Sequence, residues 1–142
     1  MKKLFFAFIV LFFANTTLYS QTPPKMKFLI HVTQTDSTVA ALAFLVAKTA
    51  LAEGHTVNLF LAGDAVKLLQ DPILNTLTGL GTGKLREHYE DIVAGNGRFY
   101  LSGNSSKARG VTEADLKDKP AEFALPTVLV KLAAESDRVF TY

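Results

Sequence analysis

The chain of 142 residues carries 15 Lys and Arg against 13 Asp and Glu, a formal net charge of +2, and 49% of its residues are hydrophobic. A chain of this length fits one domain built around one core. It contains no cysteine, which excludes disulfides, thiol chemistry and a cysteine-held metal cluster.

Residues 1–20 are predicted to be a secretory signal peptide. Two lysines precede an uninterrupted apolar run over residues 4–14, and Ser20 supplies a small residue at the expected cleavage point. The run is too short to span a bilayer as a stable helix, so we expect a periplasmic or secreted protein with no stable membrane span after cleavage; an uncleaved anchor is the alternative. Cleavage leaves 13 basic and 13 acidic side chains (15 − 2 against 13), which argues against binding to nucleic acid.

Residues 21–26, with Pro23 and Pro24, are predicted to be an extended tether, and residues 27–142 to be one α/β domain. Strand and helix patterns alternate along this domain, which predicts a doubly wound parallel sheet of four main strands with helices on both faces. The expected strands are 27–33, 56–61, 99–101 and 138–141. The expected helices are 37–53, 64–69, 71–77, 84–94, one starting at 106–109 and a last helix over 125–136. A short turn is expected from 112, beginning with a capping box over 112–115.

The helix predicted for 37–53 is apolar almost all round, with Asp36 or Ser37 as its cap and Gly54 as its end. One side must cover the sheet. The rest either faces a second subunit, which favours a homo-oligomer, or packs into a crowded helix layer.

The stretch F-Y-L-S-G-N-S-S-K-A-R-G-V, from Phe99 to Val111, is predicted to be a strand, a tight turn and a helix start. Gly103 permits the turn and Asn104 or Ser105 caps the helix. In parallel sheets ligands collect at the carboxyl ends of strands, where strand order reverses, so the loops 33–36, 62–64 and 102–106 all compete for a site. Free N–H groups and two cations in the next turn favour a small anion as ligand. The candidate ligand-binding residues are His31, Ser102, Gly103, Asn104, Ser105, Ser106, Lys107 and Arg109.

Alternative interpretations of single residues remain open. Arg109 precedes Gly110 and can instead cap carbonyls at the helix end. His31 lies in an apolar strand, where it serves as a ligand contact or as a core histidine with a satisfied partner. His55 and His88 are expected to be exposed.

The sequence lacks the motifs of several cofactor and catalytic sites. Gly79, Gly81 and Gly83 follow a helix and do not have the dinucleotide spacing G-x-G-x-x-G, so we expect them to form a flexible loop. The serines of the 102–106 turn do not complete G-x-S-x-G. No two histidines have the spacing of metal ligands on a helix. We therefore expect neither a cofactor nor a metal site.

Three stretches together resemble the DsrE and DsrF-like proteins of the sulfur-relay type: K-F-L-I-H-V-T with A-A-L-A-F-L-V-A-K, V-N-L-F-L-A-G-D-A-V, and F-Y-L-S-G-N-S-S-K-A-R-G-V. The resemblance implies a doubly wound parallel sheet, assembly into homo- or hetero-oligomers and, in active members, a persulfide on a cysteine just after the strand before this helix. Ser102 occupies that position. A hydroxyl cannot form a persulfide, so the family's route of sulfur transfer is closed to this chain.

Three hypotheses follow for the function. The first is an exported DsrE-like protein without thiol chemistry that oligomerises and binds a small ligand, such as an anion, or a protein partner at the turn from Ser102 to Arg109. The second is an enzyme that uses Ser102 or His31 on an unknown substrate. The third is a purely structural oligomer with a vestigial site.

Overall fold

The computed structural model describes residues 24–142, so the predicted signal peptide lies outside the described residues. Five parallel strands form one sheet in the order β6–β5–β2–β1–β7. They are β1 (Lys27–Val32), β2 (Thr56–Leu61), β5 (Arg98–Ser102), β6 (Ala121–Ala124) and β7 (Arg138–Thr141). The predicted class, a single α/β domain with a parallel sheet, is confirmed.

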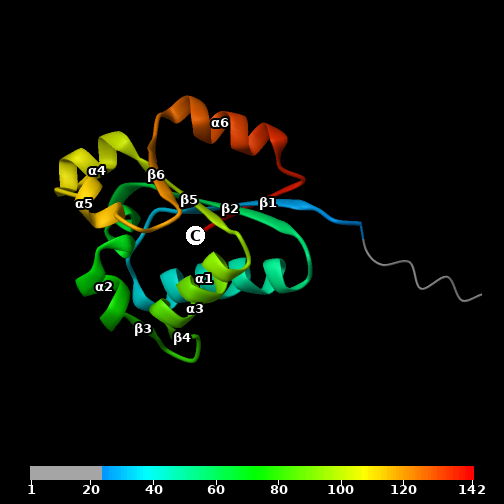
Figure 1. Cartoon of the computed structure of the whole chain (residues 1–142), viewed down its shortest axis with the longest axis horizontal. Coiled ribbons are helices and arrows are strands. Elements are labelled where there is room, and N and C mark those ends of the chain that lie inside the picture. Colours follow the sequence, from blue (N-terminus) through cyan, green and yellow to red (C-terminus); the bar gives the residue numbers. More distant parts are fainter. Residues whose placement is uncertain (1–23) are drawn as a thin grey trace, which may run out of the picture.

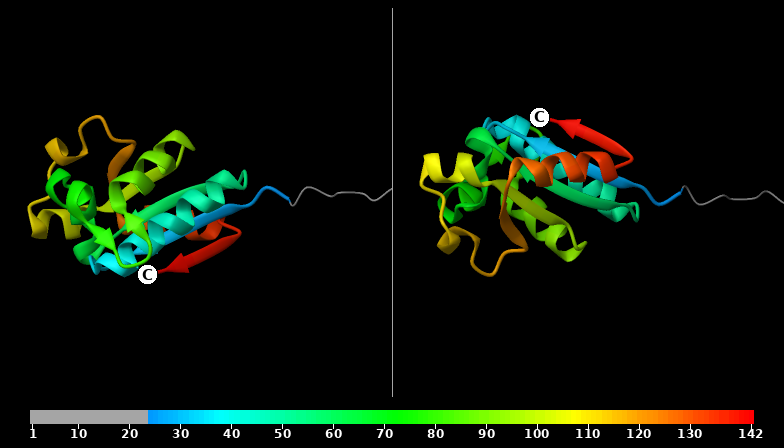
Figure 2. Two further views of the ribbon diagram at one scale, coloured as in Figure 1. Left: turned by 90° about the horizontal axis from the view of Figure 1, so that it is seen from below. Right: turned by 90° about the horizontal axis from the view of Figure 1, so that it is seen from above.

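Helices cover both faces of the sheet, and Figure 1 shows α1 and α3 on one side and α6 on the other. The helical elements are α1 (Ser37–Ala52), the 3₁₀ helix η2 (Gly63–Leu69), α2 (Asp71–Thr76), α3 (Leu85–Ala94), α4 (Gly103–Arg109), α5 (Glu113–Leu116) and α6 (Pro126–Glu135). From β1 to β6 the chain moves across the sheet in one direction. It then returns over the opposite face through α6 to place β7 beside β1, as Figure 2 shows.

Three short strands were not predicted. The strand β6 is only four residues long, A-E-F-A, and follows Pro120, so it carries too short a pattern to be recognised. The glycine-rich segment 79–83, expected to be a flexible loop, is instead closed by a small antiparallel pair of β3 (Thr78–Gly79) and β4 (Gly83–Lys84).

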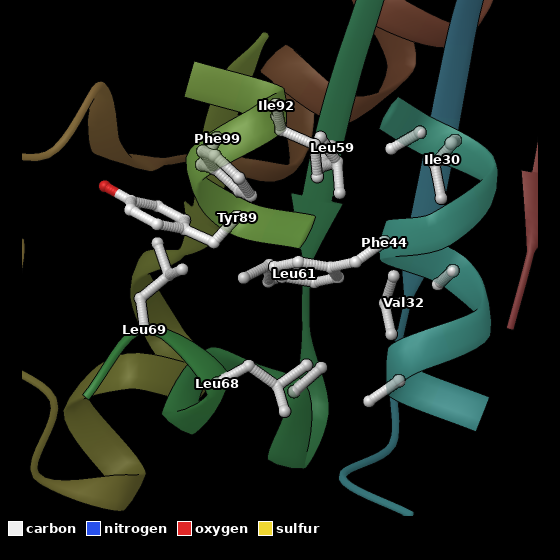
Figure 3. Close-up of a cluster of buried hydrophobic side chains, with 14 of the residues drawn as sticks. Ile30, Val32, Phe44, Leu59, Leu61, Leu68, Leu69, Tyr89, Ile92 and Phe99 are labelled. Atoms are coloured by element: carbon white, nitrogen blue, oxygen red, sulfur yellow. The ribbon is translucent and has the colours of Figure 1, made fainter. Parts of the chain in front are cut away.

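The main core lies between the sheet and the layer of α1 and α3. Phe44 of α1 and Tyr89 of α3 both pack against the ring of Phe99 on β5 (Figure 3). Their ring centroids lie 5.7 and 5.4 Å from that of Phe99. These rings are buried in one cluster with aliphatic side chains of the sheet, of η2 and of the helices, and the burial of this apolar surface stabilises the domain.

Helix α1 is covered within the chain on more than its sheet side. The hairpin of β3 and β4 packs so closely on it that a Cβ added at Gly79 would lie 2.8 Å from the Ser37 carbonyl oxygen and 2.6 Å from the Ala41 Cβ. Of the large apolar side chains of α1, only Leu42 is exposed, at 39%. The apolar composition of this helix is therefore explained by a crowded layer.

The second face of the sheet is covered far more thinly. The core there consists of Leu29, Phe60, Ala124 and Leu132, and Leu132 is the only buried residue of α6. At the edge of the sheet all four residues of β7 are exposed. Among the described residues no helix combines the length and apolar character needed to cross a membrane.

Candidate functional site

The turn after β5 forms differently from the prediction. Ser102 ends the strand, and its Oγ accepts a hydrogen bond from the backbone N–H of Ser105 at 3.4 Å, so Ser102 caps α4 itself. Gly103 is the first helical residue. The expectation that Gly103 permits a turn and that Asn104 or Ser105 caps the helix is wrong, because a cap on the last strand residue leaves no turn to be made. Gly110, with φ of +68°, ends the helix as expected.

One face of α4 is tied to the turn after β2. The Oγ of Ser105 accepts from the backbone N–H of Gly63 at 3.1 Å. Arg109 Nε donates to Asp64 Oδ1 at 2.6 Å, and the bond and charge of Arg109 hold the pKa of Asp64 below its usual range. Arg109 also donates to the Ser105 carbonyl from Nη1 at 3.5 Å, as the carbonyl-capping alternative predicts. Arg109 and Ser105 thus join two strand-to-helix connections.

The other face of α4 lines a groove with a cavity volume of about 370 Å³. Helical spacing (i, i+3, i+4, i+7) places Gly103, Ser106, Lys107 and Gly110 on this face, and Val111, Thr112 and Phe123 complete the lining. Below, "the α4 groove" means this cavity.

Two polar side chains in the α4 groove lack partners. Ser106 is only 2% exposed, and its Oγ is buried without a hydrogen bond to any described residue. Lys107 is exposed, and no carboxylate of the described residues lies within ion-pair distance of it. The helix thus separates the two predicted cations, because Lys107 faces the groove whereas Arg109 faces Asp64.

Asn104 is exposed and lines neither the α4 groove nor the contact with η2. His31 lies on the same side of the sheet as Ser102, but β2 runs between their strands. Two strand spacings and a two-residue offset put their Cα atoms about 12 Å apart. The structure does not bring His31 and Ser102 together, and the ligand roles of these residues stay predictions.

His31 is a half-buried residue of β1, and among the described residues it lacks the partner expected of a core histidine. Its Nε2 is buried without a hydrogen bond to a described residue, and the ring packs against Phe60 with centroids 6.0 Å apart. Burial lowers the pKa of His31, because the charged imidazolium would lose its hydration.

The strand order reverses between β1 and β7, at some distance from α4. There the backbone N–H and the Oγ1 of Thr33 both donate to the carbonyl oxygen of Tyr142, at 3.0 and 3.1 Å. Burial raises the pKa of the Tyr142 hydroxyl. The reversal point is therefore occupied by contacts within the chain, and the α4 groove lies at the end of β5 and β6 instead.

The other two histidines are more buried than expected. His88 is 5% exposed and donates from Nε2 to the carbonyl of Thr82, which fastens the hairpin of β3 and β4 to α3. His55 accepts a hydrogen bond at Nδ1 from the N–H of Met26 at 3.2 Å. The prediction that both are exposed is wrong. Within residues 24–142 no three His, Asp or Glu side chains converge as a metal site would require.

Two further clefts contain ion pairs formed within the chain. In a cleft of about 450 Å³ beside α3, Asp71 pairs with Arg86 at 3.6 Å and with Lys119 at 3.1 Å, and burial raises the pKa of Tyr89. A second cleft of about 450 Å³, at the ends of α1 and α3, is spanned by the ion pair of Lys48 and Asp91 at 2.9 Å. Neither contains a predicted site residue.

Sequence reasoning missed Val111, Thr112 and Phe123 as lining residues, and Asp64 as the partner of Arg109. Phe123 was missed because its strand, β6, was not predicted. A signal for Asp64 was present, since the loop 62–64 follows a parallel strand and such loops meet at one edge of the sheet.

Solved structures of low sequence identity share the fold. The ychN protein from E. coli superposes with a TM-score of 0.66 at 18% identity, covering 84% of this chain and 100% of that one. A conserved protein of unknown function from Bacteroides thetaiotaomicron, BT1422, gives a TM-score of 0.62 at 13% identity, covering 82% of this chain and 94% of that one. No curated protein shows significant sequence similarity. The DsrE/DsrF-like family matches over residues 26–142, and the chain therefore belongs to that family.

Proposed function

We propose that this protein is an exported, oligomeric DsrE-like protein that performs no thiol chemistry and binds a small ligand, with an anionic group, or a protein partner beside α4. The observation that carries the proposal is the α4 groove. It holds the buried hydroxyl of Ser106 and the unpaired ammonium of Lys107, two donors for which the described residues offer no acceptor. Small-ligand sites commonly combine an apolar cavity with a few such polar groups.

The absence of cysteine supports a role for this protein without sulfur transfer. The chain contains no cysteine, and Ser102, which stands at the expected cysteine position, uses its hydroxyl to cap α4. A serine hydroxyl has a pKa far above that of a thiol and forms no persulfide. A family scaffold without its carrier atom is consistent with a binding role.

Two further observations support oligomerisation and export. Leu125 and Val130 of the α6 region are 66% and 69% exposed, and Val139 on β7 is 49% exposed, an apolar surface of the kind that contacts between subunits cover.

Lys2 and Lys3, followed by the apolar run to Ala14, support export to the periplasm or the medium.

The proposal is tested by melting the mature protein in the presence of acetate, phosphate and sulfate. At least one anion should raise the melting temperature, because a ligand that binds only the folded state stabilises it. Lys107→Ala should remove the shift. The control Lys84→Ala changes an exposed lysine on β4 and should retain it. Arg109→Ala should lower the baseline melting temperature yet retain the shift, since Arg109 is held by Asp64.

A shift that persists unchanged in Lys107→Ala would place the anion elsewhere and contradict the proposal. A stable multimer that responds to no ligand at all would favour the purely structural oligomer.

A further inference from the structure

Ser106 differs from three hydroxyl groups that lie in, or directly after, other described helices. The side chains of Thr49, Thr76 and Ser136 each donate to the carbonyl four residues earlier, at 2.6–2.8 Å. Ser106 makes no such bond to a described residue, although it is almost fully buried. A buried polar group without a partner is uncommon in a native protein and calls for an explanation. One explanation is a ligand that supplies the missing hydrogen-bond partner of Ser106.

The walls of the α4 groove are mostly apolar. Val111 and Phe123 form part of the lining, and the glycines at 103 and 110 add no side chain to it. The space beside Gly103 is not needed for packing: a Cβ added there would meet only the Ala124 carbonyl oxygen, at the ordinary contact distance of 3.7 Å. The volume of about 370 Å³ lies at the small end of ligand pockets.

The unpaired polar groups of the α4 groove suit a ligand with a single negative charge better than one with several. Ser106 and Lys107 are neighbours in sequence and offer one hydroxyl and one ammonium, whereas the hydroxyl of Thr112 donates to Asp115 at 3.2 Å. Arg109, the other cation of α4, is bound to Asp64 on the opposite face and is not available to the groove. A doubly charged phosphate is bound best by several charge-assisted donors, whereas a monoanion beside apolar walls needs fewer.

We infer that the α4 groove binds an apolar monocarboxylate, whose carboxylate accepts hydrogen bonds from Ser106 and Lys107 and whose hydrocarbon part lies against Val111 and Phe123. The inference names the ligand class for the proposed function and rests on it. Octanoate is the probe, with acetate as the short acid and octanol as the matched uncharged chain.

Calorimetric titration of the mature protein separates the contribution of the carboxylate to binding from that of the hydrocarbon chain. Octanoate should bind at least tenfold more tightly than acetate, phosphate or octanol. Gly103→Leu, which fills the groove where the backbone leaves room, should weaken octanoate at least tenfold. The control Ala108→Leu adds the same side chain at an exposed position of α4 outside the groove and should bind as the wild type does. Lys107→Met should abolish the preference for octanoate over octanol.

Each contrary result has a distinct meaning. Equal affinity for acetate and octanoate, both lost in Lys107→Met, would overturn the ligand class and leave the proposed function intact. Octanoate binding that is unchanged in both Gly103→Leu and Lys107→Met would overturn the site. Failure of every anion to bind would overturn the proposed function as well. If Gly103→Leu does not melt cooperatively, Lys107→Met decides alone.

Discussion

Neighbouring residues of α4 have different tasks because a helix turns successive side chains by about 100°. Ser105 and Arg109 hold the helix against the turn after β2, while Ser106 and Lys107 face the α4 groove. The segment 105–109, S-S-K-A-R, therefore contains side chains that are hydrogen-bonded within the fold and side chains that have no partner among the described residues. The free groups are the ones that can serve a ligand.

His31 gives a pH dependence whose sign follows from its burial. Its pKa is lowered in the folded state, so the unfolded chain binds the proton more tightly. Its contribution to stability is therefore fully present above the unfolded value of 6.5 and is lost as the pH falls below it, towards the lower folded value. His31→Phe, which keeps an aromatic ring against Phe60, should remove this loss.

Urea unfolding at pH 7.5 and 5.5 measures the effect of His31→Phe. The wild type should lose more stability between the two values than the variant does, because only the wild type takes up this proton on unfolding. Equal losses would show that His31 does not couple folding to pH.

The caps of α1 and α5 were predictable from sequence, whereas the cap of α4 and the burial of histidines were not. The Asp36 carboxylate accepts from the N–H groups of Thr38 and Val39, both at 3.0 Å, and Thr112 and Asp115 form the expected capping box. These contacts join residues two or three positions apart. The burial of His88 depends on a hairpin that closes over it, which no local pattern reveals.

At the scale of elements, long periodic segments were predicted within one or two residues, whereas the three short strands β3, β4 and β6 were missed. Helix α1 and strand β2 match their predicted spans closely, because their apolar patterns repeat over many residues. Strand β6 and the hairpin of β3 and β4 are stabilised by partners far along the chain. The missed strand β6 carries Phe123, so the α4 groove could not be assembled from the sequence.

The hairpin of β3 and β4 gives the prediction at this scale. His88→Phe keeps a ring of similar size but removes the hydrogen bond to the Thr82 carbonyl, which should lower the free energy of unfolding by about 1 kcal/mol. Hydrogen exchange should accelerate at residues 78–84, because the hairpin opens without the rest of the fold. Exchange that rises equally over the sheet, or not at all, would show that His88 does not fasten the hairpin.

At the scale of the whole molecule, the alternation of strands and helices predicted the fold class but not the path of the chain. The chain returns to β7 through α6, and this single helix has to cover the second face of the sheet. On that side β7 forms the edge of the sheet and β1 is its neighbour. Helix α6 buries little, whereas α1 is covered by the sheet, α3 and the hairpin. We therefore expect the surface that contacts another subunit to lie at α6. The apolar sequence of α1 had indicated that helix instead.

Val130 tests the proposed oligomer at that surface. It is 69% exposed on α6, and a carboxylate there would be costly to bury between subunits. At micromolar concentration the wild type should sediment as a multimer, and Val130→Asp should raise the dissociation constant at least tenfold with an unchanged melting curve of the monomer. The control Leu80→Asp alters an even more exposed leucine, at 88%, on the hairpin of β3 and β4, and should leave the assembly unchanged. A monomeric wild type would remove oligomerisation from the proposed function, and a multimer equally sensitive to both substitutions would move its interface away from α6.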